Sequence, residues 1–186
     1  MLTVRKARMS DIPSMMALIN NYAQEGIMLP RNEFELAEGV RDFVVVLRGD
    51  EFTGCAALHF YGPALAEVRS LAVDSASKGT GAGRLLMEAL ESEARAFDLE
   101  ALFAFTYVPG FFEKLGYHEV GRDDLPLKAW KDCLRCPKFQ ACDEIAVVKR
   151  LKPGAALRTL SSSPEDRLVA LPIPQKGVVQ IHTWPR

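Results

Sequence analysis

Three alternating glycines, Gly79, Gly81 and Gly83, leave a short stretch of backbone N–H groups that no side chain covers. An apolar segment predicted to be a strand ends at Val73 before them, and an apolar segment with helical periodicity follows them directly. Backbone donors at a helix N-terminus, where the helix macrodipole is positive, bind anions such as a pyrophosphate. A glycine-rich turn can also serve only to adopt positive φ angles. The flanking strand and helix favour the anion site.

The spacing of these glycines narrows the class of ligand. A nicotinamide dinucleotide site needs G-x-G-x-x-G and an acidic residue about 20 residues later, whereas this turn reads G-x-G-x-G. The nucleoside triphosphate loop G-x-x-x-x-G-K-[ST] is absent from the sequence. Residues 78–83 (KGTGAG) instead resemble the acetyl-coenzyme A loop of the GNAT superfamily of N-acetyltransferases, whose pattern is Gln/Arg-x-x-Gly-x-Gly/Ala. Lys78 stands at the Gln/Arg position, where a lysine also suits a phosphate as a point charge.

This resemblance implies acetyl-coenzyme A (acetyl-CoA) as the co-substrate. The N–H groups of the glycine turn would bind its pyrophosphate. The N–H groups of Leu71 and Val73 would hold the pantetheine as an added strand and polarise the thioester carbonyl. The cofactor-binding residues that the resemblance implies are Leu71, Ala72, Val73, Lys78, Gly79, Thr80, Gly81, Ala82, Gly83, Arg84 and Phe112.

The composition is that of one globular domain. The chain has 186 residues, of which 48% are hydrophobic and 25% are charged, and its 23 basic residues balance 24 acidic ones. This balance gives no electrostatic footprint for nucleic acid, and no basic helix points to a membrane surface. No apolar run reaches transmembrane length, and residues 1–6 lack a signal-peptide core. We therefore expect a cytoplasmic protein whose four cysteines are reduced thiols or metal ligands.

Apolar periodicity and turn residues divide residues 2–151 into strands and helices. The expected strands cover residues 2–6, 43–47, 52–60, 67–73, 102–105, 117–120 and 144–151. The expected helices run from an N-cap at Ser10 to Gly26, over 33–41 with Asn32 as cap, over about 81–97, and over 109–115 before Gly116. This order is also that of the GNAT superfamily, and residues 109–117 (PGFFEKLGY) resemble its short helix that ends in Gly-Phe or Gly-Tyr. The resemblance implies an α+β, GNAT-like acyl-CoA N-acyltransferase fold, with a mixed central sheet of about seven strands and about four helices.

The chain is expected to form one GNAT acetyltransferase domain over residues 1–151, with a cysteine-bearing insert at about 124–143. After residue 151, a Pro-Gly pair and a serine-rich stretch are typical of turns and loops rather than of regular strands and helices. We expect residues 152–186 to form a C-terminal extension, which is either a loosely ordered tail or contains short strands at 167–173 and 178–181.

Five further segments narrow the choice of acyl acceptor. Residues 29–31, 41–43, 54–58, 66–73 and 105–112 resemble the acetyltransferase domain of bacterial N-acetylglutamate synthases, in particular the short forms that lack an amino-acid kinase domain. The resemblance implies L-glutamate as the acceptor, in arginine biosynthesis. Glutamate carries two carboxylates, so its site needs two cationic or amide-rich anchors that leave the amine accessible. The substrate-binding residues that we expect are Arg31, Arg69, Thr106 and Lys128, and the resemblance implies that Leu29 and Ser70 also border the glutamate site.

Arg31 is the first choice among these residues, because the resembling synthases place a substrate-contacting arginine at this position. A loop arginine is more commonly a solvated surface residue, which is the alternative for Arg31. Lys128, or Lys138 in the same insert, would meet a substrate carboxylate if the insert shapes a lid over the acceptor.

Two charged side chains, Glu67 and Arg69, interrupt a strand that is expected to be central. Charges in such a strand must be paired or lie in a solvated cleft. We expect Glu67 to line the acceptor cleft as a catalytic base, whereas Arg69 is either its salt-bridge partner or a second cleft residue. An α-amine is mostly protonated near neutral pH, and Glu67 would take its proton through a bridging water. Alternation predicts that one face of the strand carries Glu67, Arg69, Leu71 and Val73 and that the other carries Val68, Ser70 and Ala72.

The acid that protonates the leaving thiolate is where the sequence departs from the superfamily pattern. Many GNAT enzymes carry a tyrosine in the short helix, four residues before its glycine, and this chain has Phe112 there, which cannot donate a proton. Tyr107 is the candidate catalytic acid nearby, with a half-buried strand-end residue as the alternative. The thiolate could also leave unprotonated, or a water could protonate it.

Three cysteines cluster in the insert as C-x₂-C-x₅-C, at Cys133, Cys136 and Cys142. C-x₂-C is a common half of a zinc site, but a structural site needs four ligands. Asp143 or His118 could complete it. The alternative is a loop of small buried thiols or a labile Cys133–Cys136 disulfide. We therefore expect no metal, with zinc kept as the competing hypothesis.

Two other functions stay open. The domain could acetylate another amine, such as a different amino acid, a polyamine, a protein N-terminus or a lysine. It could also be a non-catalytic acetyl-CoA sensor, which the missing helix tyrosine favours and Glu67 speaks against. The expected partner is a small-molecule amine, with no nucleic acid and no membrane. The resemblance adds a homodimer as an expectation, because GNAT domains often pair.

Overall fold

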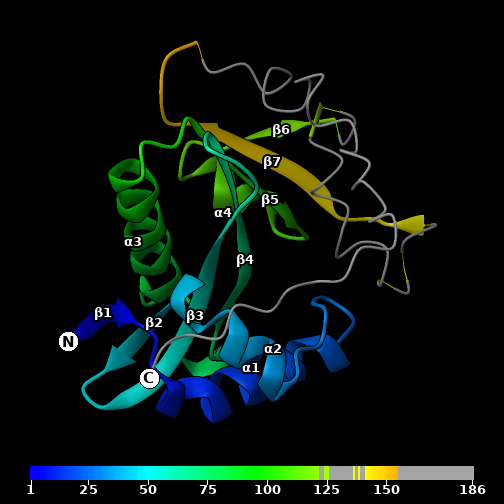
Figure 1. The fold of residues 1–186 in the computed structure, drawn as a ribbon. Helices are drawn as coiled ribbons and strands as arrows, with labels where there is room; N and C mark the ends of the chain where they lie inside the picture. The colour runs from blue at the N-terminus through cyan, green and yellow to red at the C-terminus, as the bar shows by residue number, and fades with distance from the viewer. Residues whose placement is uncertain (122–123, 126–135, 137, 139–140, 155–186) are drawn as a thin grey trace, which may run out of the picture.

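A seven-stranded mixed sheet organises the part of the chain that is described, in the order β1-β2-β3-β4-β5-β7-β6 (Figure 1). The structure is a computed structural model, which describes residues 1–121, 124–125, 136, 138 and 141–154. The strands are β1 (Leu2–Lys6), β2 (Phe43–Arg48), β3 (Glu51–Phe60), β4 (Leu65–Val73), β5 (Ala101–Thr106), β6 (His118–Val120) and β7 (Ile145–Arg150). The α-helices of these described residues are α1 (Ile12–Gln24), α2 (Glu33–Glu38), α3 (Ala82–Ala96) and α4 (Pro109–Glu113).

This architecture confirms the predicted α+β fold with seven strands and four helices, while some helix ends differ. Ser10 does not cap α1, so that prediction was wrong. A 3₁₀ turn over Met9–Asp11 precedes the helix, because the Asp11 carboxylate accepts from the N–H of Arg8 at 2.7 Å and from the guanidinium of Arg5. Helix α2 ends at Glu38, earlier than predicted, and a second 3₁₀ turn follows it.

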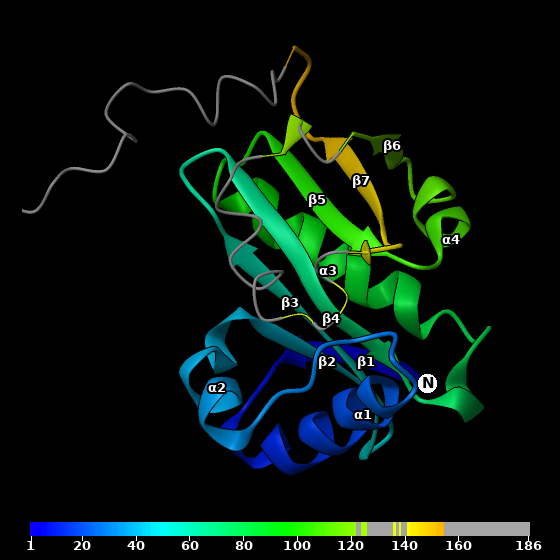
Figure 2. The same ribbon diagram turned by 90° about the vertical axis from the view of Figure 1, so that its right-hand side faces the viewer.

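Strands β4 and β5 are parallel neighbours that separate along their length (Figure 2). They pair only over residues 65–67 and 101–103, although β4 continues to Val73 and β5 to Thr106. The other neighbouring pairs among the described strands are antiparallel. The ends of β4 and β5 therefore leave a gap in the middle of the sheet, where the backbone N–H and C=O groups of β4 that point away from β3 lack a neighbouring described strand.

A bulge in β4 lies at the start of this gap. Between the pairs Ala57–Arg69 and Cys55–Ala72, β3 contributes one residue and β4 contributes two, the first of which is Ser70. Ser70 adopts φ 49°, in the left-handed region. An extra residue of this kind bends the strand and reverses the side-chain alternation beyond it.

The bulge corrects the predicted faces of β4. Val68 before it and Leu71 and Val73 after it all pack in the core that contains α3, whereas Ala72 packs in the core that contains α1. By alternation Glu67 lies on the opposite face from Val68, and hence from Leu71 and Val73. The prediction that Glu67 and Arg69 share a face with these two residues was wrong, because no local pattern in the sequence signals the inserted residue.

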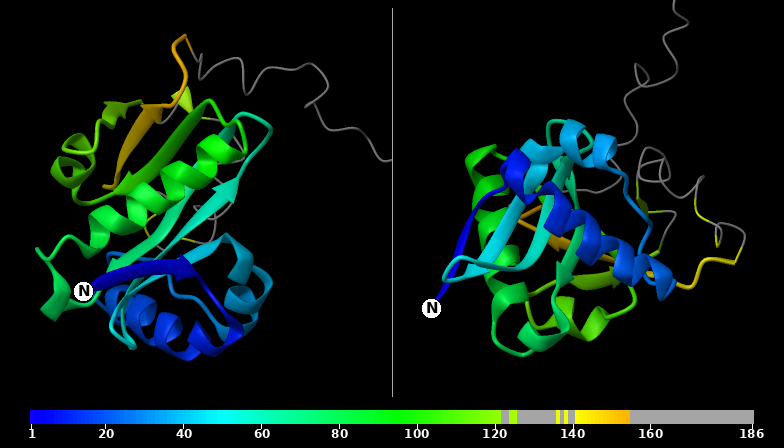
Figure 3. Two further views of the ribbon diagram at one scale, coloured as in Figure 1. Left: turned by 90° about the vertical axis from the view of Figure 1, so that its left-hand side faces the viewer. Right: turned by 90° about the horizontal axis from the view of Figure 1, so that it is seen from below.

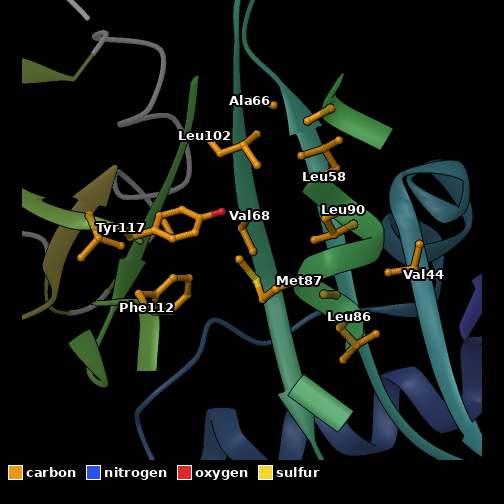
Figure 4. Packing of buried hydrophobic residues seen from close by; sticks show 14 of the residues in the cluster. Val44, Leu58, Ala66, Val68, Leu86, Met87, Leu90, Leu102, Phe112 and Tyr117 are labelled. Atoms are coloured by element: carbon orange, nitrogen blue, oxygen red, sulfur yellow. The ribbon is translucent and has the colours of Figure 1, made fainter. Parts of the chain in front are cut away.

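Two cores hold the helices on opposite faces of the sheet (Figure 3). Helix α3 has buried apolar residues at 86, 87, 90 and 94, a helical spacing that forms one continuous stripe. This stripe packs on alternate residues of β2, β3 and β4, as Figure 4 shows for Val44, Leu58 and Val68. On the other face, Met15 and Ile19 of α1 and Leu36 of α2 pack on the residues in between. The sheet and both helix layers thus fix the rim of the gap.

Candidate functional site

A cleft of about 920 Å³ opens where β4 and β5 separate. Segments that are far apart in the sequence line it: the end of α1 with the following loop, the second half of β4, the glycine turn before α3, the end of β5, and α4. Side chains of the insert complete the wall. The lining residues fall within 22–31, 67–73, 77–84, 105–108 and 111–112, together with Cys136, Lys138, Cys142 and Glu144.

The glycine turn is open and pre-shaped. Gly79 has φ 78° and Gly81 has φ 93°, and a Cβ atom added to either would meet nothing within 4 Å. Both positions therefore use the positive φ that glycine allows, and they leave space in front of their amides. Helix α3 begins at Ala82, so the N–H groups of its first turn have no carbonyl in a preceding turn to bind. The turn thus has the geometry of an anion site at a helix N-terminus.

The residues of this turn divide into those that line the cleft and those that shape it. Lys78, Gly79, Gly81, Gly83 and Arg84 line the cleft, together with Leu71, Ala72 and Val73 of β4. Thr80 is not among the lining residues: its N–H and its hydroxyl both donate to the carbonyl of Ser77, at 3.3 and 2.7 Å. Ala82 is buried.

Tyr22, near the end of α1, joins the glycine turn to β4. Its hydroxyl donates to the carbonyl of Val73 at 2.6 Å, and the Lys78 ammonium lies 4.9 Å from the centre of its ring. Hydrogen bonding with Tyr22 raises the pKa of Lys78, so this lysine carries its charge beside the anion site throughout the neutral range.

Glu67 and Arg69 lie in the wall of the cleft and are paired with each other. The Nε atom of Arg69 donates to Oε2 of Glu67 at 2.6 Å. Tyr61, in the turn after β3, donates its hydroxyl to the same oxygen at 2.9 Å and accepts from Nη2 of Arg69. Only 8% of Glu67 is exposed. The pair is therefore both a salt bridge and part of the cleft wall, as the two interpretations of the sequence proposed. Tyr61 belongs to the same hydrogen-bonded group, and no sequence pattern indicated it.

Arg31 lies in the loop between α1 and α2 and lines the cleft with Leu29. Its side chain is 15% exposed, and Nη1 lies 4.0 Å from Oε1 of Glu35. It is therefore not a solvated surface arginine. Ser70, at the bulge, also lines the cleft.

Tyr107 lies at the end of β5, where its hydroxyl donates to Oδ1 of Asp143 at 2.8 Å and accepts from Nζ of Lys138 at 3.0 Å. Burial raises the pKa of Tyr107, and the hydrogen bond from Lys138 opposes this rise. Thr106 is buried, and its hydroxyl accepts from the N–H of Val108 at 3.0 Å before α4 begins. Phe112 lines the cleft and also packs in the core between two aromatic rings.

The insert is only partly described. Lys128 and Cys133 lie outside the described residues, whereas Cys136 and Cys142 line the cleft. The thiol of Cys142 is 3.9 Å from Oε2 of Glu144. Among the described residues, no group of three or more His, Cys, Asp or Glu side chains is placed to hold a metal ion. The fourth cysteine, Cys55, lies in β3 and is buried in the core that contains α1, and this burial raises its pKa to about 12.

Comparisons with known proteins agree with this geometry. Residues 13–117 match the Acetyltransferase (GNAT) family. An uncharacterised N-acetyltransferase of Chlorobaculum tepidum is 43% identical over 148 residues, which cover 80% of this chain and 96% of that protein. An amino-acid acetyltransferase of Mycobacterium tuberculosis is 37% identical over 120 residues, which cover 63% of this chain and 68% of that protein. N-acetylglutamate synthase of Neisseria gonorrhoeae, solved in complex with coenzyme A and N-acetyl-glutamate, matches with a TM-score of 0.74 and 27% identity over 82% of this chain and 35% of that chain.

The fold and the cleft define a transferase that uses an acyl-CoA as donor. The chain belongs to the GNAT family of acetyltransferases, as the glycine turn and the order of elements predicted. It is an acetyl-CoA-dependent N-acetyltransferase whose relatives include amino-acid acetyltransferases and whose solved structural neighbours include an N-acetylglutamate synthase. Within the described part of the chain, every helix is too short or too polar to span a bilayer.

Proposed function

We propose that this protein transfers the acetyl group of acetyl-CoA to the α-amine of L-glutamate. One observation carries the proposal: a single cleft joins the glycine turn to a wall that contains Arg31, Arg69, Lys138 and Glu67. The glycine turn can bind the pyrophosphate of the donor, and the basic side chains of the wall can bind the two carboxylates of glutamate. The carboxylate of Glu67 can accept a proton from the attacking amine. The solved N-acetylglutamate synthase of Neisseria gonorrhoeae, which holds coenzyme A and N-acetyl-glutamate, supports the same pair of substrates.

The donor would bind along the gap between β4 and β5. The amides of Gly79, Gly81, Gly83 and Arg84 would hold the pyrophosphate, with Lys78 as an added positive charge. The pantetheine would lie beside β4 beyond Glu67, as an added strand that bonds to the backbone at Leu71 and Val73.

The acetyl transfer would be direct. Glu67 removes a proton from the ammonium group of glutamate through a water molecule, the amine nitrogen then forms a bond to the thioester carbon, and the bond from that carbon to sulfur breaks. The amine nitrogen would then lose its second proton to solvent water, and the coenzyme A thiolate would take up one proton from Tyr107 or from water, so that one proton is released for each acetyl group transferred. Arg69 and Tyr61 both donate to Oε2 of Glu67, which holds the carboxylate in one orientation in the cleft wall.

Arg31 would bind one carboxylate of glutamate, and Lys138 would bind the other. Both side chains line the cleft, and they come from different walls, the loop after α1 and the insert. Two separated cations can discriminate glutamate from amino acids with one carboxylate, because the second cation then has no charged partner in the substrate.

The test is acetyl-CoA turnover with single amino acids, followed as release of free thiol. We expect release with glutamate that falls at least 100-fold in kcat/KM in Arg31→Ala, while Arg48→Ala, which removes an exposed arginine at the end of β2, keeps the wild-type value. Turnover of other amines but not of glutamate would refute glutamate as the acceptor. Binding of acetyl-CoA without turnover of any amine would instead identify a sensor.

A further inference from the structure

Asn20 of α1 binds the backbone of Arg31 with both ends of its carboxamide. Its Nδ2 donates to the carbonyl of Arg31 at 2.9 Å, and its Oδ1 accepts from the N–H of the same residue at 2.9 Å. This pair of bonds resembles the contact that a neighbouring strand would make, although Arg31 lies in a loop. One side chain therefore fixes the peptide groups on both sides of the Arg31 Cα.

The residues after Arg31 are fixed independently. Asn32 caps α2: its Oδ1 accepts from the N–H of Glu35 at 2.9 Å, and its own N–H donates to Oε2 of Glu35 at 3.1 Å. The other carboxylate oxygen of Glu35 is 4.0 Å from Nη1 of Arg31. The backbone of Arg31 is thus held by Asn20, and the residues that follow it are held by the cap of α2. Its guanidinium forms an ion pair with Glu35.

We propose that Asn20 is a positioning residue for the acyl acceptor, which sets the affinity of the cleft for a substrate carboxylate by fixing the backbone of Arg31. The inference rests on the proposed function, in which Arg31 binds a carboxylate of the amino acid. A guanidinium binds a carboxylate through two parallel bonds only if its plane is correctly placed. A loop that must be ordered at each binding event binds more weakly than one that is already ordered.

The chemistry of the carboxamide explains why an asparagine is needed. An aspartate at this position could still accept from the N–H of Arg31, but its second oxygen would face the carbonyl oxygen of Arg31 and repel it. An alanine would remove both contacts. Both variants should therefore weaken acceptor binding. Asn20→Ala loses two hydrogen bonds, and Asn20→Asp loses one.

The experiment compares Asn20→Ala with Asn21→Ala, its neighbour on α1, which is exposed. We expect Asn20→Ala to raise the KM for the acceptor about 10- to 100-fold while the KM for acetyl-CoA stays within twofold of wild type. Asn21→Ala should leave both values unchanged. Equal acceptor KM values for the two variants, with an active wild type, would overturn the inference and leave the proposed function intact.

A double-mutant cycle separates positioning from a general loss of structure. In the Arg31→Ala background, Asn20→Ala should have no further effect on the acceptor KM, because the side chain that it positions is gone. An unchanged 10- to 100-fold effect in that background would overturn the inference. Amide hydrogen exchange provides a readout that does not depend on turnover: the N–H of Arg31 should exchange faster in Asn20→Ala than in Asn21→Ala. If the wild type turns over no amino acid, the proposed function fails, and exchange still reports whether Asn20 holds the loop.

Discussion

The Nε atom of Arg69 lies 2.6 Å from Oε2 of Glu67, so the two charged side chains of β4 neutralise each other in the wall of the cleft. Their side chains are 14% and 11% exposed, which excludes most of the water that would otherwise screen them. A substitution at Glu67 therefore changes both a chemical group and the partner of a half-buried cation. Variants at this position must keep the shape of the side chain if they are to report on catalysis.

Glu67→Gln is the variant that keeps this shape. Its carbonyl oxygen can accept from Arg69 and Tyr61, but the amide cannot take up a proton, so we expect kcat to fall by about 10²- to 10⁴-fold while the KM for acetyl-CoA is unchanged. Steady-state kinetics measure both values, and urea denaturation checks the fold. Glu51→Gln, at an exposed glutamate that begins β3, is the control with wild-type activity. A kcat for Glu67→Gln within twofold of wild type would exclude Glu67 as the base.

The elements that depend on local sequence could be predicted. The apolar stripe of α3 and the open glycine turn before it are encoded within residues 79–94, so periodicity and glycine spacing are enough to infer them. The cap of α2 by Asn32 is local in the same way. These features led to the correct fold and family.

The features that depend on contacts between different elements could not be predicted. The bulge at Ser70 follows from pairing with β3, and one inserted residue reverses every later side chain of β4. Asn20 contacts the backbone of Arg31, and Tyr61 contacts the side chain of Glu67. Asparagine and tyrosine are common in helices and turns, so neither contact has a signature in the sequence. Such contacts become visible only when the loops are folded against each other.

Gly81→Ala tests the glycine turn as the donor site. Gly81 has φ 93°, so a Cβ there costs about 1–2 kcal/mol of stability and enters the open space before the first amides of α3. We expect the KM for acetyl-CoA, measured by initial rates, and the Kd for coenzyme A, measured by calorimetric titration, to rise at least tenfold. Gly49→Ala is the matched control, because Gly49 has φ 63° and open space in the turn between β2 and β3. It should lose similar stability and keep the KM. A similar rise in both variants would show that the effect comes from lost stability alone.

Tyr107→Phe tests the proton donor at the end of β5. We expect kcat to fall about tenfold or more, since the phenyl ring keeps the packing and loses the hydroxyl between Lys138 and Asp143. Because burial raises the pKa of Tyr107 above its ordinary value of about 10, the phenol stays protonated through neutral and mildly alkaline pH. At pH values below about 10, ionisation of Tyr107 should therefore cause no decrease in the kcat of the wild type. If kcat is unchanged in Tyr107→Phe, water protonates the thiolate.

A second tyrosine, Tyr117, carries a hydroxyl in a very different environment. It packs against Phe112 in the core beside α3, and its hydroxyl, directed toward Val68 in Figure 4, has no hydrogen-bond partner among the described residues. The ammonium of Lys149 lies 5.6 Å from the centre of its ring and is paired with Glu91 at 2.6 Å. Burial, followed by the negative charge of Glu91, raises the pKa of Tyr117, so the phenol is neutral at every pH at which the fold is studied.

Tyr117→Phe should therefore stabilise the protein, in contrast to most core substitutions. A buried hydroxyl without a partner costs about 1–3 kcal/mol, whereas the phenyl ring keeps the contact with Phe112. We expect the free energy of unfolding, measured by urea denaturation, to rise by about 1 kcal/mol with an unchanged m-value. The kcat should stay at the wild-type value, because Tyr117 is not among the residues that line the cleft. A less stable Tyr117→Phe variant would show that the hydroxyl is hydrogen-bonded in solution, and a fall in kcat would place it, rather than Tyr107, on the path of the proton to the thiolate.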